Sequence, residues 1–170
     1  MALKADRTEL DVDISFFYNE GTATRGGIVV IDTVGSGAAM DQARAKVKYA
    51  QANPASSVPV GVLLNDVVNL DLTRQHINWH KDEVQKGGKV TLLKKGTIVT
   101  DMVDIAAPNH GTTVTAGQVA YASSGTAGYF TTQYTHAHAK PNQLAVGRFL
   151  STKDDDGYYK IDINLPNGNE

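Results

Sequence analysis

Apolar and polar residues alternate along the first segment of the chain that has a regular pattern. Large apolar side chains occupy every second position there: Leu10, Val12, Ile14, Phe16 and Tyr18. Because successive side chains of a β-strand point to opposite faces, this period of two predicts a strand over 10–18 with one apolar face. Residues 1–9 are charged and lack such a period, which is typical of an arm with little structure of its own.

Short apolar runs separated by turn-forming residues continue through the rest of the chain. They predict further strands over 28–31, 60–64, 118–122, 128–132, 144–150 and 159–165. Turns recurring at roughly 8 to 12 residues between short strands are typical of barrels and sandwiches. We therefore expect an all-β fold, a small barrel or sandwich of short antiparallel strands.

The middle of the chain predicts a hairpin. Apolar runs cover 89–94 and 97–103, and Lys95-Gly96 between them has the composition of a turn. A long polar connection, 65–86, precedes the hairpin and contains Trp79. Connections of this length are usually functional or wrap the domain, and a helical turn near Trp79 is as compatible with the pattern as an extended segment.

Residues 38–52 set helix propensity against strand periodicity. Alanine and lysine favour a helix, yet apolar and basic residues alternate, and we interpret the segment as a half-exposed strand. Its basic face consists of Arg44, Lys46 and Lys48. Such a face usually keeps a sheet edge from pairing with other chains, and it could also contact an acidic protein. These residues and Trp79 are therefore candidates for an oligomer or partner surface.

Composition removes several classes of function. The formal net charge is −2, so nucleic acid is not expected as a main ligand. Cysteine is absent, which excludes disulfides, thiolate metal sites and cysteine nucleophiles. No apolar stretch approaches the roughly 20 residues that span a bilayer. We expect no membrane partner and a protein made and retained in the cytoplasm of the cell that synthesises it, unless lysis releases it.

Residues that could carry chemistry are few. His136 and His138 would share one face of a strand, and His110 or Asp104 could supply a third ligand, but exposed loop histidines explain the pair more simply. Asp154, Asp155 and Asp156 before Gly157 lack the other ligands of a calcium loop and predict a tight turn. We therefore expect no catalytic residues, no metal and no cofactor.

Three segments resemble the decoration, or cement, proteins of tailed-phage heads. The resemblance covers roughly residues 26–165 and rests on short glycine-based motifs: Pro59-Val60-Gly61-Val62-Leu63-Leu64, the stretch 87–100, and Ala145-Val146-Gly147 running to Asp156-Gly157-Tyr158-Tyr159-Lys160-Ile161. It implies a non-enzymatic, β-tulip-like protein with an extended N-terminal arm (1–25) and a barrel or sandwich domain (26–170). It also implies that the protein binds the outer surface of the virion capsid, commonly as a homotrimer, and clamps neighbouring major capsid subunits.

The resemblance leaves alternatives for both the arm and the function. The strand at 10–18 could add to a sheet of the major capsid protein or pair inside its own domain. A virion-surface carbohydrate- or receptor-binding domain is the alternative function, with aromatic candidates Tyr129-Phe130, Tyr134 and Tyr158. A metal-dependent enzyme that uses the histidines is a third possibility.

Overall fold

The computed structural model describes residues 2–32, 46–50, 58–68, 83–105, 113–123, 125–132 and 145–165. Within these residues the chain forms strands and no helix, which confirms the all-β expectation. The strands are β1 (Thr8–Tyr18), β2 (Ile28–Ile31), β3 (Lys46–Tyr49), β4 (Pro59–Leu63), β5 (Asp66–Val68), β6 (Glu83–Gln85), β7 (Lys89–Thr100), β8 (Val119–Ala122), β9 (Phe130–Thr131), β10 (Ala145–Phe149) and β11 (Tyr159–Asn164).

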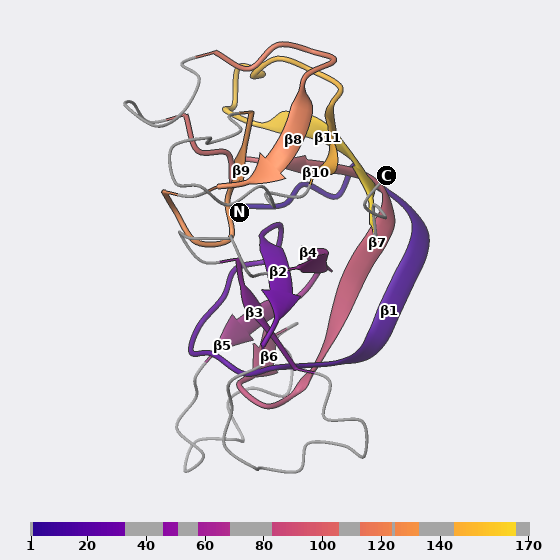
Figure 1. Cartoon of the computed structure of the whole chain (residues 1–170), viewed down its shortest axis with the longest axis vertical. Coiled ribbons are helices and arrows are strands. Elements are labelled where there is room, and N and C mark those ends of the chain that lie inside the picture. Colours follow the sequence, from indigo (N-terminus) through magenta and orange to yellow (C-terminus); the bar gives the residue numbers. More distant parts are fainter. Residues whose placement is uncertain are drawn as a thin grey trace.

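One large sheet of nine strands follows the order β1-β3-β2-β4-β7-β11-β10-β8-β9, and β1 also pairs with β7. The pairings of β1, β3, β2, β4 and β7 therefore form a ring, and β11, β10, β8 and β9 continue the sheet beyond β7 (Figure 1). Most pairings are antiparallel, but β1–β3 and the separate β5–β6 pair are parallel. The strongly curved sheet produces a sandwich-like fold; the barrel alternative stays a prediction.

Strand β7 corrects the predicted hairpin at Lys95-Gly96. The strand runs without a turn through Gly96, and only its neighbour changes: β7 pairs with β4 at Leu92 and Leu93 and with β11 from Lys95 onward. Gly96 has φ +145°, and a Cβ there would lie 2.0 Å from the carbonyl oxygen of Thr8 in β1. The glycine permits a close approach of two backbones in a bent strand, because glycine has no Cβ.

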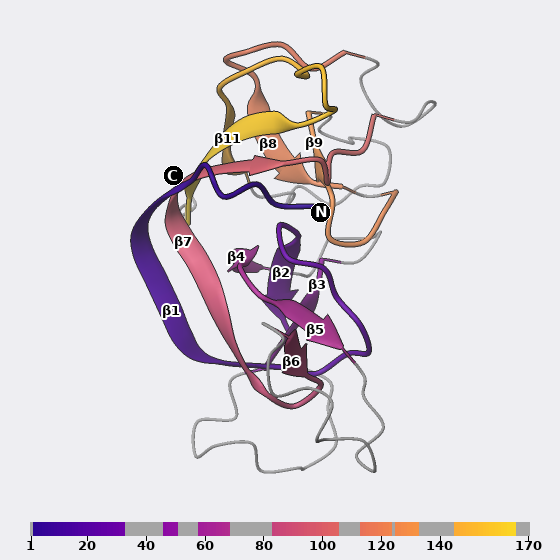
Figure 2. The ribbon, with the colours of Figure 1, turned by 180° about the vertical axis from the view of Figure 1, so that it is seen from behind.

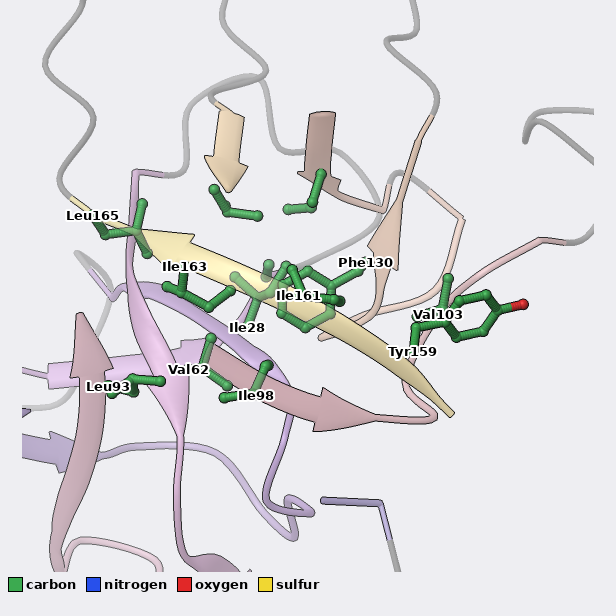
Figure 3. Close-up of a cluster of buried hydrophobic side chains, with 14 of the residues drawn as sticks. Ile28, Val62, Leu93, Ile98, Val103, Phe130, Tyr159, Ile161, Ile163 and Leu165 are labelled. Carbon is green, nitrogen blue, oxygen red and sulfur yellow. The ribbon is translucent and has the colours of Figure 1, made fainter. Parts of the chain in front are cut away.

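The hydrophobic core has two clusters on opposite faces of the same strands. Val62 and Leu93 belong to the cluster shown in Figure 3, together with Phe130 and Ile161. Their sequence neighbours Leu63 and Leu92 belong to a second cluster, which also contains Tyr18. Strands β4 and β7 are thus buried on both faces at Val62-Leu63 and Leu92-Leu93, and this explains why apolar residues follow one another there.

The first residues of the chain are tied to the body, contrary to the expectation of an arm with little structure. Leu3 is 1 % exposed and belongs to the same core cluster as Val62 and Leu93. It forms a bridge with Thr100, and the Lys4 backbone N–H donates to the Val99 carbonyl oxygen at 2.9 Å. A buried apolar residue and backbone contacts to β7 thus anchor a segment that has no periodic pattern. The division into residues 1–25 and 26–170 stays a prediction.

Several further strand predictions are confirmed within the described residues. The hairpin expected around 123–125 is present as the antiparallel pair β8 and β9. The alternating segment that competed with a helix forms β3. Within the polar connection 65–86, β5 and β6 lie at its two ends and pair with each other, and residues 69–82 lie outside the described residues.

Candidate interaction surface

Strand β1 follows the outer side of the curved sheet alongside β7 in both Figures 1 and 2. Its apolar side chains are not equally covered. Leu10 and Ile14 are 68 % and 63 % exposed, Val12 is 38 % exposed, and Tyr18 is completely buried. We call Leu10, Val12 and Ile14 the apolar strip. The strip is exposed on a strand that the rest of the molecule already holds in place.

One edge of β1 is paired along most of its length, and the other is open. Residues 8–17 pair antiparallel with β7, with register shifts that accompany the curvature of the two strands. On the opposite edge, only Phe17 and Tyr18 have strand partners within the described residues, namely Lys46 and Val47 of β3. Among the described residues, the backbone of 8–16 therefore has no partner on this second edge, which we call the open edge of β1.

The polar positions of β1 carry a row of acids. Glu9 forms an ion pair with Arg7, which directly precedes the strand, and Asp13 forms one with Lys94 of β7 at 2.5 Å. The Lys94 ammonium, helped by the Ser15 hydroxyl, lowers the pKa of Asp13 to about 2. Asp11 lies opposite Lys95, but no ion pair joins Asp11 to any described residue.

The C-terminal end of β1 belongs to the core rather than to the surface. The Tyr18 ring packs edge-on against Tyr49, with ring centroids 6.1 Å apart, and burial raises the Tyr18 pKa. Phe16 is half-buried: it packs against the second core cluster, and the Lys94 ammonium lies 5.8 Å from its ring centre in a cation–π contact. Of the five residues predicted to contact a capsid, Tyr18 is therefore covered by the chain itself and Phe16 is covered in part.

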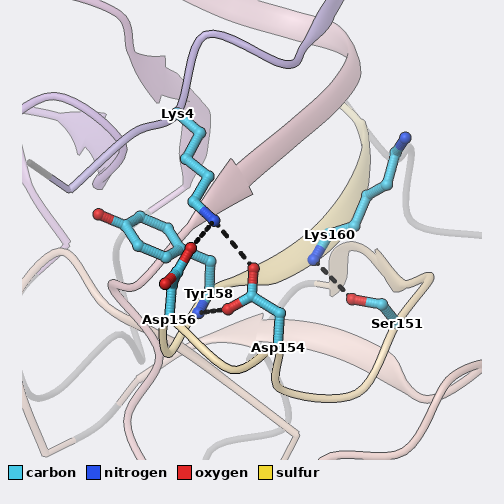
Figure 4. A network of polar contacts seen from close by, with 6 residues as sticks. All are labelled: Lys4, Ser151, Asp154, Asp156, Tyr158 and Lys160. Atoms are coloured by element: carbon cyan, nitrogen blue, oxygen red, sulfur yellow. Dashed lines mark hydrogen bonds and ion pairs between the residues drawn. The ribbon is translucent and has the colours of Figure 1, made fainter.

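A polar network binds the N-terminal segment to the turn that contains Asp154 and Asp156 (Figure 4). The Lys4 ammonium lies 3.0 Å from a carboxylate oxygen of Asp154 and 3.0 Å from one of Asp156, and 4.3 Å from the ring centre of Tyr158. The two carboxylates raise the pKa of Lys4. The pKa of Asp154 is lowered mainly by the hydrogen bond from the Tyr158 backbone N–H, and further by Lys4. The predicted aspartate turn is confirmed and also holds the chain terminus.

The basic candidates are only partly described. Lys46 is 8 % exposed, and the Lys48 ammonium lies 3.4 Å from the largely buried carboxylate of Asp32. Lys46 is therefore buried, whereas Lys48 remains partly exposed. The role of both lysines in a partner surface stays a prediction. Arg44 and Trp79 lie outside the described residues. Their role as a partner surface stays a prediction.

The alternative sites receive little support from the residues that the structure describes. Phe130 is completely buried, so it cannot belong to an exposed aromatic platform, and Lys4 lies over the half-buried Tyr158. Asp104, a conceivable metal ligand, is 8 % exposed and accepts a hydrogen bond from the Ser123 hydroxyl at 2.7 Å. The histidines of the metal hypothesis and Tyr134 lie outside the described residues.

A shallow pocket of about 280 Å³ lies beside β5, between the segment 22–24 and Tyr49. Its polar groups already contact one another. The Tyr49 hydroxyl accepts from the Thr24 N–H and donates to the Thr24 carbonyl oxygen, and Asp66 accepts from the Arg25 N–H at 2.8 Å. These contacts stabilise the loop around the pocket.

The described part of the chain contains no helix long and apolar enough to cross a membrane.

Sequence reasoning identified the apolar strip but missed the residues that surround it. Lys94 and Lys95 contact or face β1 only because of the β1–β7 register, and no periodic signal connects positions so far apart in the chain. Lys4 was missed because a single lysine in a charged segment has no distinguishing pattern. These contacts depend on topology.

Comparison with known proteins identifies a family. The model of the phage structural cement protein family (E217 gp24/Pam3 gp6) matches residues 7–164. This range includes all of β1 and continues to the end of β11. A search of curated proteins found no match.

Proposed function

Because this chain belongs to the family of phage structural cement proteins, we propose that it binds the outer surface of the phage head and clamps neighbouring major capsid subunits. Members of this family are structural components of the virion capsid and not enzymes, and they stabilise the shell. The outer location, the identity of the shell partner and the clamping mode are the new elements of the proposal.

The observation that carries the proposal is the apolar strip on β1. Leu10, Val12 and Ile14 are exposed on β1, and residues 8–16 of this strand have β7 as their one strand partner within the described residues. Fully burying one such side chain contributes roughly 1.5–3 kcal/mol, so covering the strip supplies a useful part of a binding energy. The strand is already held by β7, which reduces the ordering cost that binding must overcome.

A homotrimer fits this function for a reason of symmetry. A shell presents several identical copies of its subunits around each symmetry axis, and an oligomer with matching symmetry engages several copies at once. Linked contacts can raise the overall affinity by roughly 10² to 10⁴ without any new kind of contact. Native mass spectrometry of the purified protein measures the subunit number, and a monomer both in solution and on the shell would refute the trimer.

Co-sedimentation with shells that lack the protein tests the binding surface. The triple variant Leu10→Ser/Val12→Ser/Ile14→Ser should remain folded and lose shell binding. The matched control replaces three apolar residues of similar exposure elsewhere, Ile31→Ser/Val58→Ser/Leu150→Ser, and should bind normally. A folded β1 triple variant that binds as tightly as the unmodified protein would show that the strip is not the contact. An unmodified protein that fails to bind shells would overturn the function.

A further inference from the structure

The connection between β10 and β11 contains the one Asp-Gly dipeptide of the sequence, Asp156-Gly157. Gly157 has φ +95°, and a Cβ placed there would meet only Lys153 Cε, at 3.5 Å, among the described residues beyond its chain neighbours. Because glycine has no side chain, nothing on residue 157 itself shields its backbone nitrogen. The Asp156 side chain is 75 % exposed. A carboxyl and a backbone nitrogen that can react with each other thus lie together in an accessible turn.

Reaction between these two groups needs no reagent except water. The Gly157 nitrogen loses its proton and attacks Cγ of the protonated Asp156 carboxyl. The new N–C bond forms, the C–OH bond breaks and water leaves, which gives a five-membered cyclic imide. Water then adds to one of the two imide carbonyl carbons. Cleavage of the bond from nitrogen to Cγ restores aspartate, whereas cleavage of the bond from nitrogen to the main-chain carbonyl carbon leaves isoaspartate, with no net change of mass.

The folded protein holds both groups away from this reaction. The Gly157 N–H donates to the Asp154 carbonyl oxygen at 3.0 Å, so the attacking nitrogen is engaged in the turn. The Asp156 carboxylate lies 3.0 Å from the Lys4 ammonium and is directed toward it in Figure 4. The carbon of an ionised carboxylate is a poor electrophile. Lys4 is itself held in place, because Leu3 beside it is buried in the core.

We propose that Asp156 is a site of spontaneous isomerisation to isoaspartate, that the ion pair with Lys4 protects this site, and that the modification loosens the N-terminal segment. Isoaspartate adds one carbon to the main chain. The backbone hydrogen bonds that join Asp154 to Gly157 and Tyr158 span this position, so the added carbon should open the turn. Lys4 then loses the ion pairs that bind residues 2–4 to the turn.

Peptide mapping after prolonged incubation measures the reaction. The full chain is kept in mildly acidic buffer, below the melting temperature of every variant, and isoaspartate is labelled with a protein-isoaspartate methyltransferase. Lys4→Met removes the ammonium but keeps a long side chain. It should raise the rate at Asp156 by about two- to fivefold, the range that loss of an exposed ion pair allows. Asp156→Glu should abolish the signal, because a five-membered ring can no longer form.

Two matched variants separate the ion pair from other effects of substitution. Lys4→Arg keeps the charge, and Lys160→Met removes a lysine whose ammonium points away from the network in Figure 4. Both should react at the rate of the unmodified protein. Absence of isoaspartate at Asp156 from the unmodified protein and from Lys4→Met would overturn the site. A rate in Lys4→Met equal to that of either matched variant would overturn protection by the ion pair.

Hydrogen exchange measures the consequence for the N-terminal segment. The Lys4 amide donates to the Val99 carbonyl oxygen, and it should exchange faster in protein enriched in isoaspartate. Amides of β4, which does not contact the turn through any described hydrogen bond, should exchange as before. Unchanged exchange at Lys4 would refute the coupling between the modified turn and the N-terminal segment.

Discussion

The two ends of β1 have the same sequence pattern and opposite environments. Around Leu10 and Ile14 the strand pairs with β7 alone within the described part of the chain, and its apolar side chains are exposed. At Phe17 and Tyr18 the strand also pairs with β3, and Tyr18 is completely buried. Alternation therefore identifies an apolar face but not what covers it. The buried end should stabilise the fold, and the exposed part should stabilise a complex.

Removing the whole strand should have the largest effect. Deleting residues 1–18 takes away the partner of β7, the buried Tyr18 and the anchor Leu3, and we expect the isolated protein to lose its cooperative thermal transition. The serine triple variant of the apolar strip should keep that transition and serves as the control. A truncated protein that melts cooperatively near the original temperature would show that β1 is dispensable for folding.

Truncating the buried end alone should have the next largest effect. Tyr18→Ala should lower the free energy of unfolding by about 3–5 kcal/mol, because it leaves a cavity between Tyr49 and the second core cluster. Leu10→Ala should change it by less than about 0.5 kcal/mol. Guanidinium denaturation measures both values. Similar losses for the two variants would contradict the division of β1 into a stabilising end and a binding part.

The exposed part still depends on a close backbone contact with β7. Gly96→Ala should destabilise the protein by about 1–3 kcal/mol, since the new Cβ would overlap the Thr8 carbonyl oxygen. Gly21→Ala is the matched control: beyond its chain neighbours, no heavy atom lies within 4 Å of the place that the new Cβ would take, and its effect should be within about 0.5 kcal/mol. If both substitutions are equally tolerated, β1 is not held tightly against β7 at this point.

The smallest effect concerns the Asp13–Lys94 ion pair. Because the folded pKa of Asp13, about 2, lies below its ordinary value, the pair stabilises the protein above about pH 4 and loses this contribution as the pH falls toward 2. Asp13→Asn should remove this part of the acid sensitivity, a change of about 1 kcal/mol or less. The free energy of unfolding, measured at several acidic pH values, tests this contribution, and Asp155→Asn is the control. If Asp13→Asn and the unmodified protein lose stability identically as the pH falls, the Asp13–Lys94 pair does not contribute to stability.

Local periodicity determined the strands and one part of the candidate site. The alternation at 10–18 and 159–165 predicted β1 and β11. The structure places Leu10, Val12 and Ile14 on β1 and leaves them exposed. This works because the two-residue period of a strand is a property of the backbone itself. The absence of cysteine and the small net charge were also evident without any structure.

Only the tertiary structure decided what each face contacts. Gly96 has the composition of a turn, yet it lies inside β7, because β1 approaches its backbone from one side and β11 replaces β4 on the other. Leu3 and Lys4 lack any pattern, and their anchoring depends on residues around 100 and 154. Contacts between such distant positions arise from strand order and register, which a period along the chain does not encode.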